Sequence, residues 1–325
     1  FIYGLSFYTA YLAHQIITEK IHFHDVFIAS NPMLLFTGPI AVIFKSQRHK
    51  SLLNRLNYFI PFFITGLFFY KIIGVPLTNF FWLIEFTSCS EVILFGIIFE
   101  LFIYFNFCGL SFIVYSIFGI FGIKIPLNFK QPFSSRNIIE FWRGWHRSLS
   151  SVLRVLFYLP IKKYLPTSFA LLGVYLASAL WHGVTFNFIL WGVFHAASFI
   201  ITIKLLKLNF PKLATIIMFF AIIYGRVIFA DSNTPRLLEK LIPTFISPST
   251  TFDSLLMITP MASLIALFFA VSWVVVEFIF QDTKYLKQKN YKLLRLQSSQ
   301  FILVLIFLML IGSSTGIDYA AYGQR

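Results

Sequence analysis

The chain has 325 residues, of which 58% are hydrophobic and only 12% are charged, and its mean hydropathy is +0.81. Soluble domains carry about a quarter charged residues, so this composition excludes a water-soluble globule. The 43 Phe residues and the 20% aromatic content suit contact with acyl chains and the bilayer interface. Whether the formal net charge of +14 indicates nucleic-acid binding depends on where the basic residues lie in the sequence.

Several windows approach the roughly 20 mainly apolar residues that a bilayer-spanning helix needs. They are 1–18, 56–73, 92–123, 165–181, 184–203, 213–230, 260–280 and 301–316. We expect 92–123 to hold a tilted span and a broken extension. The shorter stretch 32–44 contains Gly38-Pro39 and is predicted to be re-entrant or interfacial. The expected fold is an all-α, polytopic transmembrane bundle of about eight spans, forming one membrane domain over residues 1–325.

The chain begins at Phe1, inside apolar sequence and without the charged region that opens a signal peptide. We therefore interpret it as the C-terminal part of a longer membrane protein.

The basic residues are clustered. Four segments, 45–55, 124–163, 204–212 and 284–295, hold 20 of the 26 Lys and Arg residues. The positive-inside rule places them on the cytoplasmic side. The loops 74–91 and 231–259 and the tail 316–325 are then predicted to lie outside. Because the charges cap loops between spans, and do not share one folded surface, a nucleic-acid groove is disfavoured.

The densest group of polar residues lies in 137–150. Placed on one helix, Trp142, Trp145, His146 and Leu149 share a face. The pattern predicts an amphipathic, Trp-anchored, basic helix on the cytoplasmic side. The alternative is an interfacial helix that floats at the headgroup level and carries no site.

His182 follows one long apolar run and precedes another, and His195 lies thirteen residues further on. Polar residues inside a membrane are costly and therefore functional candidates. A neutral imidazole at His182 could act as a general base that takes a proton from a hydroxyl nucleophile. The alternative is a packed histidine whose nitrogens are satisfied by backbone carbonyls.

Motifs for other chemistries are weak or absent. The sequence has no HExxH, GxGxxG or Walker motif. His22, His24 and Asp25 resemble a short metal cluster, but donors so closely adjacent alternate in direction on any regular element, so a metal site is disfavoured. Cys89 and Cys108 lie in apolar sequence and are predicted to be small buried hydrophobic residues. We expect neither a metal nor a permanently bound cofactor.

Four motifs, in order and spacing, resemble those of the membrane-bound O-acyltransferase family, in the branch of bacterial alginate and peptidoglycan O-acetyltransferases and teichoic acid D-alanyl transfer proteins. The family reads GISFYT, AGPI, NFxxPYxSRxxxEFWRRWHISLS and LWHG followed by LWGxxHG. The corresponding runs here are Gly4–Thr9, Phe36–Ile40, Asn128–Ser150 and Leu180–His195. The family's first helices, before the GISFYT motif, are absent from this chain.

The resemblance implies a tunnel through the thinnest part of the bundle, lined by the two characteristic histidines, His182 and His146. It implies that His182 activates an acceptor hydroxyl and that His146 orients it or stabilises the oxyanion. Arg143 and Trp145 would shape the tunnel floor. The further residues predicted near the substrate are Trp181, His195 and Arg136, the last of these beside donor phosphates.

The implied reaction moves an acyl group, most simply acetyl, from a cytoplasmic thioester, either acetyl-CoA or an acyl carrier, to an extracytoplasmic polysaccharide or peptidoglycan. D-alanyl transfer to teichoic acid and a non-catalytic flippase or transporter are the alternatives. Tyr319 in the outer tail resembles a family tyrosine that passes the acyl group to a partner acetyltransferase. An unstructured tail is the other interpretation. The implied setting is the bacterial inner membrane, among its lipids.

Overall fold

The computed structural model describes residues 2–19, 34, 45–46, 51–83, 89–241 and 259–279. Four sequence-based predictions lie outside these residues: the span at 301–316, the His22, His24 and Asp25 group, most of the 32–44 stretch, and the tail that contains Tyr319.

The described chain is helical apart from one short strand pairing. Its longer helices are α1 (Ile2–Glu19), α4 (Leu52–Leu67), α6 (Cys89–Ile120), α10 (Thr167–His182), α11 (Phe186–Lys207), α12 (Pro211–Ala230) and α15 (Met261–Ile279). Its short helical segments are η1 (Phe68–Gly74), η2 (Val75–Asn79), α5 (Phe80–Leu83), η3 (Pro132–Ser134), α7 (Ile138–Gly144), α8 (Arg147–Leu153), η4 (Arg154–Tyr158), α9 (Leu159–Tyr164) and α13 (Thr234–Leu241). Two-residue strands β1 (Lys45–Ser46) and β2 (Ile123–Lys124) pair antiparallel.

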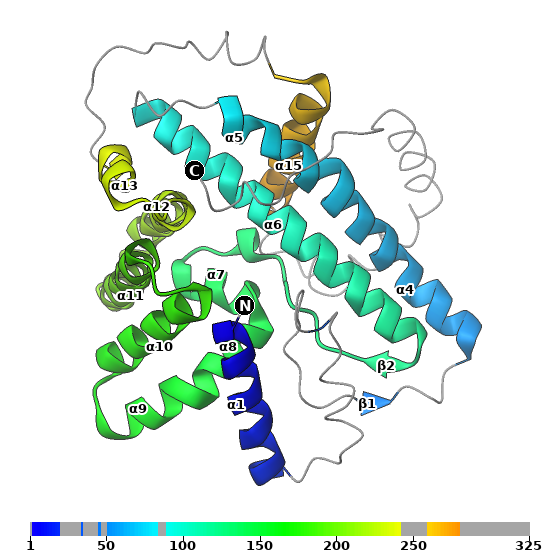
Figure 1. The fold of residues 1–325 in the computed structure, drawn as a ribbon, viewed down its shortest axis with the longest axis horizontal. Helices are drawn as coiled ribbons and strands as arrows, with labels where there is room; N and C mark the ends of the chain where they lie inside the picture. The colour runs from blue at the N-terminus through cyan, green and yellow to red at the C-terminus, as the bar shows by residue number, and fades with distance from the viewer. Residues whose placement is uncertain are drawn as a thin grey trace.

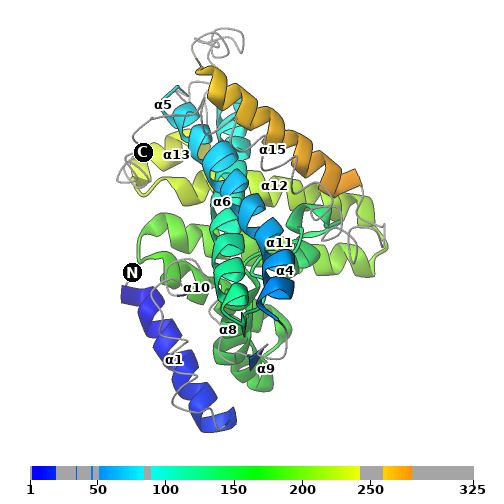
Figure 2. The same cartoon turned by 90° about the vertical axis from the view of Figure 1, so that its right-hand side faces the viewer.

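The central element is α6, which crosses the middle of the molecule beside α4 (Figures 1 and 2). At 1.5 Å per residue its 32 residues extend about 48 Å, longer than the roughly 30 Å hydrocarbon core of a bilayer. Apolar side chains surround the whole helix, and most of it is buried inside the protein. A helix that is apolar on all sides is typical of a buried core helix, so α6 is the element against which the others pack.

Small residues let α4 approach α6 closely. A Cβ on Gly66 would lie 2.7 Å from the carbonyl oxygen of Gly109, and a Cβ on Gly109 would lie 2.8 Å from that of Gly66. Contacts of this kind hold membrane helices together, because apolar surfaces gain little from association in lipid and backbone approach therefore decides the packing.

The second half of the chain builds a row of helices, α10, α11 and α12, in which neighbours in sequence pack against each other (Figure 1). The row meets the central helix through α12, and α7 and α8 lie between the row and α6. Figure 2 shows α15 running obliquely beside α6, and it packs against α6, η1, η2 and η3. The row, α6 and the α7–α8 segment surround the space in which the functional site lies.

The apolar windows are confirmed as helices wherever the structure describes them. Among the described residues, five helical segments are long and apolar enough to cross a membrane: Leu52–Asn79, Cys89–Ile120, Phe186–Lys207, Pro211–Ala230 and Met261–Ile279. The 16-residue α10 is apolar but shorter. The 18-residue α1 carries more polar side chains and is not among the five. The chain is therefore a multi-pass membrane protein.

Two details of the predicted layout were wrong. The window 92–123 holds no break, because α6 runs as one helix to Ile120. The loop expected at 74–91 is helical as far as Leu83, since η1, η2 and α5 continue the path of α4. The prediction that both cysteines are buried holds for Cys108, whereas Cys89 is only half-buried.

Candidate active site

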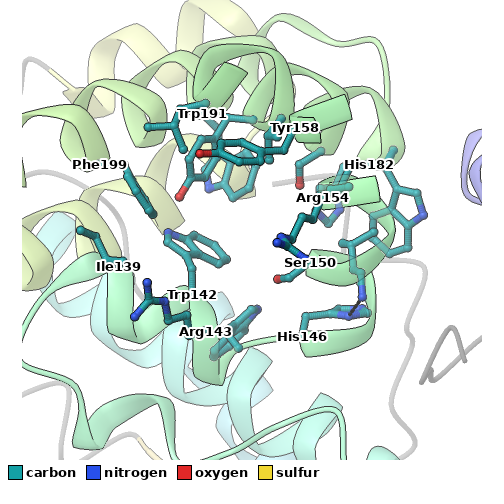
Figure 3. A pocket seen from close by; sticks show the side chains of 18 of the residues that line it. Ile139, Trp142, Arg143, His146, Ser150, Arg154, Tyr158, His182, Trp191 and Phe199 are labelled. Atoms are coloured by element: carbon teal, nitrogen blue, oxygen red, sulfur yellow. Dashed lines mark hydrogen bonds between the residues drawn. The ribbon is translucent and has the colours of Figure 1, made fainter. Parts of the chain in front are cut away.

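A cavity of about 960 Å³ lies between the helix row and the centre of the molecule (Figure 3). Its wall is built by side chains from α1, α6, α7, α8, α10, α11 and α12. Most of the lining surface is apolar, with a few polar and charged groups among many aromatic rings. Such a composition is typical of small-molecule sites, where few polar groups fix the orientation of a ligand.

The sequence predicted one continuous helix through 137–150, and this was wrong. The helix breaks between α7 and α8, where Trp145 is extended and His146 takes a left-handed conformation with φ of 40°. Non-glycine residues rarely adopt such a conformation, and strained residues of this kind cluster at functional sites. The four residues expected on one helical face, Trp142, Trp145, His146 and Leu149, nevertheless all line the cavity.

The floating interfacial helix is also excluded, because one side of this segment packs into the protein. Phe141 is 1% exposed and Trp145 is 5% exposed. The Trp145 ring packs against those of Phe129 and Tyr104, with centroids 5.1 and 5.9 Å away. The segment is a wall of the site.

Asn128, in the loop that follows β2, holds the helix break in place through hydrogen bonds. Its carbonyl oxygen accepts from the Arg147 amide at 2.8 Å. Its side-chain oxygen accepts from the Ser148 amide at 3.2 Å and from the Ser148 hydroxyl at 2.7 Å. The Leu149 amide donates to His146 Nδ1 at 3.4 Å. The first three amides of α8 are thereby satisfied, as a helix N-terminus requires.

This capping assigns the proton on His146. Because Nδ1 accepts a hydrogen bond, it carries no proton, and the neutral ring must then be protonated at Nε2. His146 therefore presents a donor, and not an acceptor, at its free nitrogen. An imidazole N–H that lines a cavity can hold a carbonyl oxygen or a developing oxyanion.

His182 is held differently, at the C-terminal end of α10. Its ring lies among the rings of Trp181, Phe188, Trp191 and Phe229, whose centroids are between 4.7 and 5.8 Å away. Within the described part of the chain no group forms a hydrogen bond with its imidazole. The structure thus gives no support to a histidine satisfied by carbonyls. An imidazole whose nitrogens are uncommitted can take up a proton.

The two histidines lie on the same cavity. Both line it (Figure 3). The centroid of the Trp181 ring is 5.9 Å from that of His146 and 4.7 Å from that of His182. They are 36 positions apart in sequence, so the packing of α10 against α8 and η4 brings them together.

The other predicted site residues divide into two groups. Trp145, Arg143 and Trp181 line the cavity. His195 does not: it is 3% exposed and lies behind the wall, with Trp142 and Trp191 at ring distances of 5.2 and 4.8 Å. A Cβ on Gly225 would come within 2.3 Å of His195 Nε2, so α12 closes over this ring.

Arg136 is also absent from the cavity wall. It is exposed, and its backbone carbonyl accepts from the Thr215 hydroxyl at 2.6 Å. The arginines that do line the cavity together with Arg143 are Arg154 and Arg226. Arg143 and Arg154 are exposed on the surface as well as lining the cavity. Cationic groups therefore stand where the cavity opens.

Sequence reasoning missed Arg226. This residue is 6% exposed and forms a buried ion pair through its Nε with Glu100 of α6. The sequence did contain an indication of this site, because Arg226 and Glu100 each lie inside an apolar window, where a charged side chain is costly. The partner could not be read from the sequence, since 126 positions separate the two residues.

A second charged cluster holds the end of α12, outside the spanning segment. Asp231 Oδ2 accepts from Arg236 Nε at 2.5 Å and from Lys240 Nζ at 2.7 Å. Burial acts to raise the pKa of Asp231, but hydrogen bonds from Arg236 and Lys240 outweigh it and hold the pKa below its ordinary value. The cluster therefore connects α13 to the end of α12. Nearby, the carbonyl oxygen of Phe229 accepts a hydrogen bond from the side chain of Asn187 on α11.

The fold and the site define a class: multi-pass helical membrane proteins that enclose a cavity bearing two histidines. The sequence profile of the membrane-bound O-acyltransferase family matches residues 56–232, more than half of the chain. The chain belongs to this family. The matched region contains most of α4, all of α6 and every helix from α7 to α12, so it includes both histidines.

Curated relatives are similar over part of their length. A peptidoglycan O-acetyltransferase of Helicobacter pylori is 38% identical over 97 residues, which are 29% of this chain and 18% of the relative. A probable alginate O-acetylase of Azotobacter vinelandii is 34% identical over 139 residues, 40% of this chain and 28% of the relative. A teichoic acid D-alanyltransferase of Bacillus subtilis is 31% identical over 109 residues, 30% of this chain and 28% of the relative. The chain thus matches under a third of the length of each.

Proposed function

We propose that this protein is a membrane O-acyltransferase that moves an acyl group, most simply acetyl, from a cytoplasmic thioester to a hydroxyl of an extracytoplasmic polysaccharide or peptidoglycan. The observation that carries the proposal is the cavity itself. It places a histidine with uncommitted nitrogens, His182, near a histidine that presents an N–H, His146. This is the pair of functions that acyl transfer to a hydroxyl requires.

The proposed reaction needs only His182 and His146 as protein groups, and every proton and bond in it is accounted for. His182 takes the proton of the acceptor hydroxyl, and the oxygen attacks the carbonyl carbon of the thioester. A C–O bond forms, and the carbonyl oxygen becomes an oxyanion that the N–H of His146 stabilises. The intermediate then collapses, the C–S bond breaks, and the proton passes from His182 to the departing thiolate. No permanently bound cofactor is needed, because the donor supplies the activated acyl group.

The cavity opening suits an anionic donor. Arg143 and Arg154 line the opening and form no hydrogen bond or ion pair with any described residue. Acetyl-CoA and the phosphopantetheine arm of an acyl carrier both bring phosphate, which arginine binds well. These two residues replace Arg136 as the proposed contacts for donor phosphate.

D-alanyl transfer to teichoic acid is the second candidate. It is supported by the similarity to the Bacillus subtilis teichoic acid D-alanyltransferase, which is comparable to that with the two acetyl-transferring relatives. The two candidates share the chemistry above and differ in the acyl group and its carrier. Assaying purified protein with acetyl-CoA, and separately with a D-alanyl carrier protein, would separate them.

We further propose an inner-membrane location, with the tail 316–325 outside and available to an extracytoplasmic acetyltransferase through Tyr319. The distribution of basic residues supports this orientation. A periplasmic reporter fused after Tyr322 should be active, and activity of only a cytoplasmic reporter would reverse the orientation. Tyr319→Phe should reduce acceptor acylation if the tail carries the acyl group, and unchanged acylation would remove that role.

The central test measures acetyl release from cell-surface glycan at matched membrane levels. His182→Ala should lower surface acylation at least about a hundredfold, the usual contribution of a general base, and His146→Ala should lower it by roughly tenfold or more. The control is His14→Ala, since His14 is an exposed histidine on α1 and the substitution is identical. Full acylation in the His182 variant would refute the assignment of the base.

A further inference from the structure

The buried ion pair between Arg226 and Glu100 reaches the wall of the cavity. Arg226 lies near the end of α12, within an apolar span, and Glu100 lies within α6. Both side chains are almost entirely buried, with exposures of 7% and 4%. Each buried ion carries a large desolvation penalty that pairing only partly offsets. An apolar pair would fill this space at lower cost, which favours a functional reason for the charges.

The geometry of the pair leaves one edge of the guanidinium uncommitted. Glu100 accepts from Nε, and no described residue forms a hydrogen bond with the two terminal nitrogens of Arg226. Arg226 also lines the cavity. Up to four N–H donors are therefore without a partner on a side chain that is more than nine-tenths buried. Buried donors of this kind are normally satisfied, and their occupant here must accept hydrogen bonds.

The aromatic neighbours place this edge near the two histidines. The guanidinium carbon lies 4.9 Å from the ring centroid of Trp145, the residue before His146. It lies 5.9 Å from the ring centroid of Phe229, which in turn packs 4.7 Å from the ring of His182. Stacking on two rings and pairing with Glu100 fix the orientation of the guanidinium. The unpartnered donors are thereby held in place beside the proposed reaction centre.

The charge of the pair selects the kind of acceptor. Glu100 already neutralises Arg226, so a permanent carboxylate or phosphate at this edge would leave a net negative charge buried in the protein. A thioester carbonyl is neutral when it binds and acquires negative charge only as the hydroxyl attacks. Donors that bind the neutral oxygen and bind the oxyanion more strongly stabilise the transition state selectively.

We infer that Arg226, positioned by Glu100, is a further active-site donor that binds the carbonyl oxygen of the acyl thioester together with His146. This rests on the proposed acyl transfer. During attack the C=O double bond becomes a C–O⁻ single bond held by the guanidinium, and the double bond re-forms as the C–S bond breaks. Arg226 gains and loses no proton in the step.

Two unreactive probes test the contact by binding alone. S-acetonyl-4′-phosphopantetheine keeps a ketone near the position of the thioester carbonyl, and S-propyl-4′-phosphopantetheine has the same chain length without the oxygen. The full chain in detergent should bind the ketone probe about tenfold or more tightly, as expected for a hydrogen bond to a charged group. Arg226→Gln should abolish this preference, and Arg226→Lys should retain part of it.

The matched control is Lys212→Gln, which removes an exposed cation at the start of the same helix and should keep the full preference. Glu100→Gln should weaken the preference, since it removes the charge that orients Arg226. In turnover, Arg226→Lys should lower kcat more than it raises KM for the donor. A wild-type preference in Arg226→Gln, or no preference in the wild type, would overturn the inference.

The probes also separate this inference from the proposed function. His182→Ala should lower transfer at least about a hundredfold while it keeps the preference for the ketone, because the carbonyl contact does not need the base. If His182→Ala transfers acyl groups normally, the proposed function fails. If His182→Ala is inactive and Arg226→Gln still prefers the ketone, only the role of Arg226 fails.

Discussion

His146 and His182 line the same cavity but are held by different forces. His146 stands at a helix break whose amides are satisfied by Asn128 and by its own imidazole. His182 ends a regular helix and is held by four aromatic rings, without a hydrogen bond to any described residue. Hydrogen bonds fix which nitrogen carries a proton, whereas ring contacts fix position and leave both nitrogens available. The first environment suits a donor, and the second suits a base.

The largest expected effect comes from breaking the hydrogen-bonded region. Asn128→Ala removes the acceptor of two hydrogen bonds from Ser148 at a site that is fully buried. Leaving a buried donor unsatisfied costs about 1–3 kcal/mol, so the melting temperature in detergent should fall by several degrees. Acyl transfer should fall more than tenfold, because the start of α8, which positions His146, loses two of the hydrogen bonds that hold it.

Ser148→Ala is the matched control for this change. It removes only the hydroxyl hydrogen bond and keeps the backbone amide paired with Asn128, so both losses should be smaller. Equal activity of Asn128→Ala and the wild type, measured per folded protein, would show that the break does not position His146.

A smaller effect is expected from loosening the aromatic region. Phe229→Leu removes the ring that packs 4.7 Å from His182 and 4.9 Å from Phe188. The transfer rate should fall about fivefold to tenfold, since a misplaced base works poorly, with little change in KM for the donor. The tautomer of His146, read from its ring nitrogen chemical shifts, should stay the same.

Phe169→Leu is the control for the aromatic region. Phe169 lies on α10, the helix that carries His182, but is 57% exposed, so this change should leave the rate within about twofold. A loss as large as that of Phe229→Leu would indicate that general stability, and not the position of His182, sets the rate.

The cavity opening should affect binding of the donor more than the reaction. Arg154→Gln is expected to raise KM for the acyl thioester about threefold to tenfold, because one phosphate contact is lost, and to leave kcat nearly unchanged. The effect should diminish at high salt, since exposed charges are screened. Lys162→Gln, a nearby exposed cation, should change neither constant. A fall in kcat without a rise in KM would place Arg154 in the reaction instead.

The smallest expected effect is on folding stability and comes from Asp231, which is paired with Arg236 and Lys240. The pKa of Asp231 is held below its ordinary value in the folded protein, so the folded state binds this proton less readily than the unfolded chain. The stabilisation is therefore complete above the ordinary Asp pKa of about 3.9 and declines as pH falls through that value towards the folded pKa. Thermal melts from pH 7 to pH 3 should show the decline.

Asp231→Asn gives the reference for these melts. The variant should melt below the wild type at pH 7, and the difference should shrink by pH 3, where the wild-type carboxylate begins to gain its proton. A difference between the two that does not depend on pH would mean that the ion pairs with Arg236 and Lys240 contribute nothing to stability.

The sequence by itself determined the class of fold and the main candidates for chemistry. Long apolar windows leave the backbone no partner but itself in lipid, so helices follow from local composition. His182 stood out because a polar residue between apolar runs is costly. Trp145, Arg143 and Trp181 followed from the family resemblance, and all three line the cavity.

Only the tertiary structure decided how these residues meet. The left-handed backbone at His146 depends on Asn128, eighteen positions away, and no periodicity within 137–150 could reveal it. The neighbours of Arg226 come from α6, α7–α8 and α12 together, and His195 leaves the cavity because Gly225 lets α12 close over its ring. Helix formation is a local process, whereas the partner of each buried polar group is set by packing between distant segments.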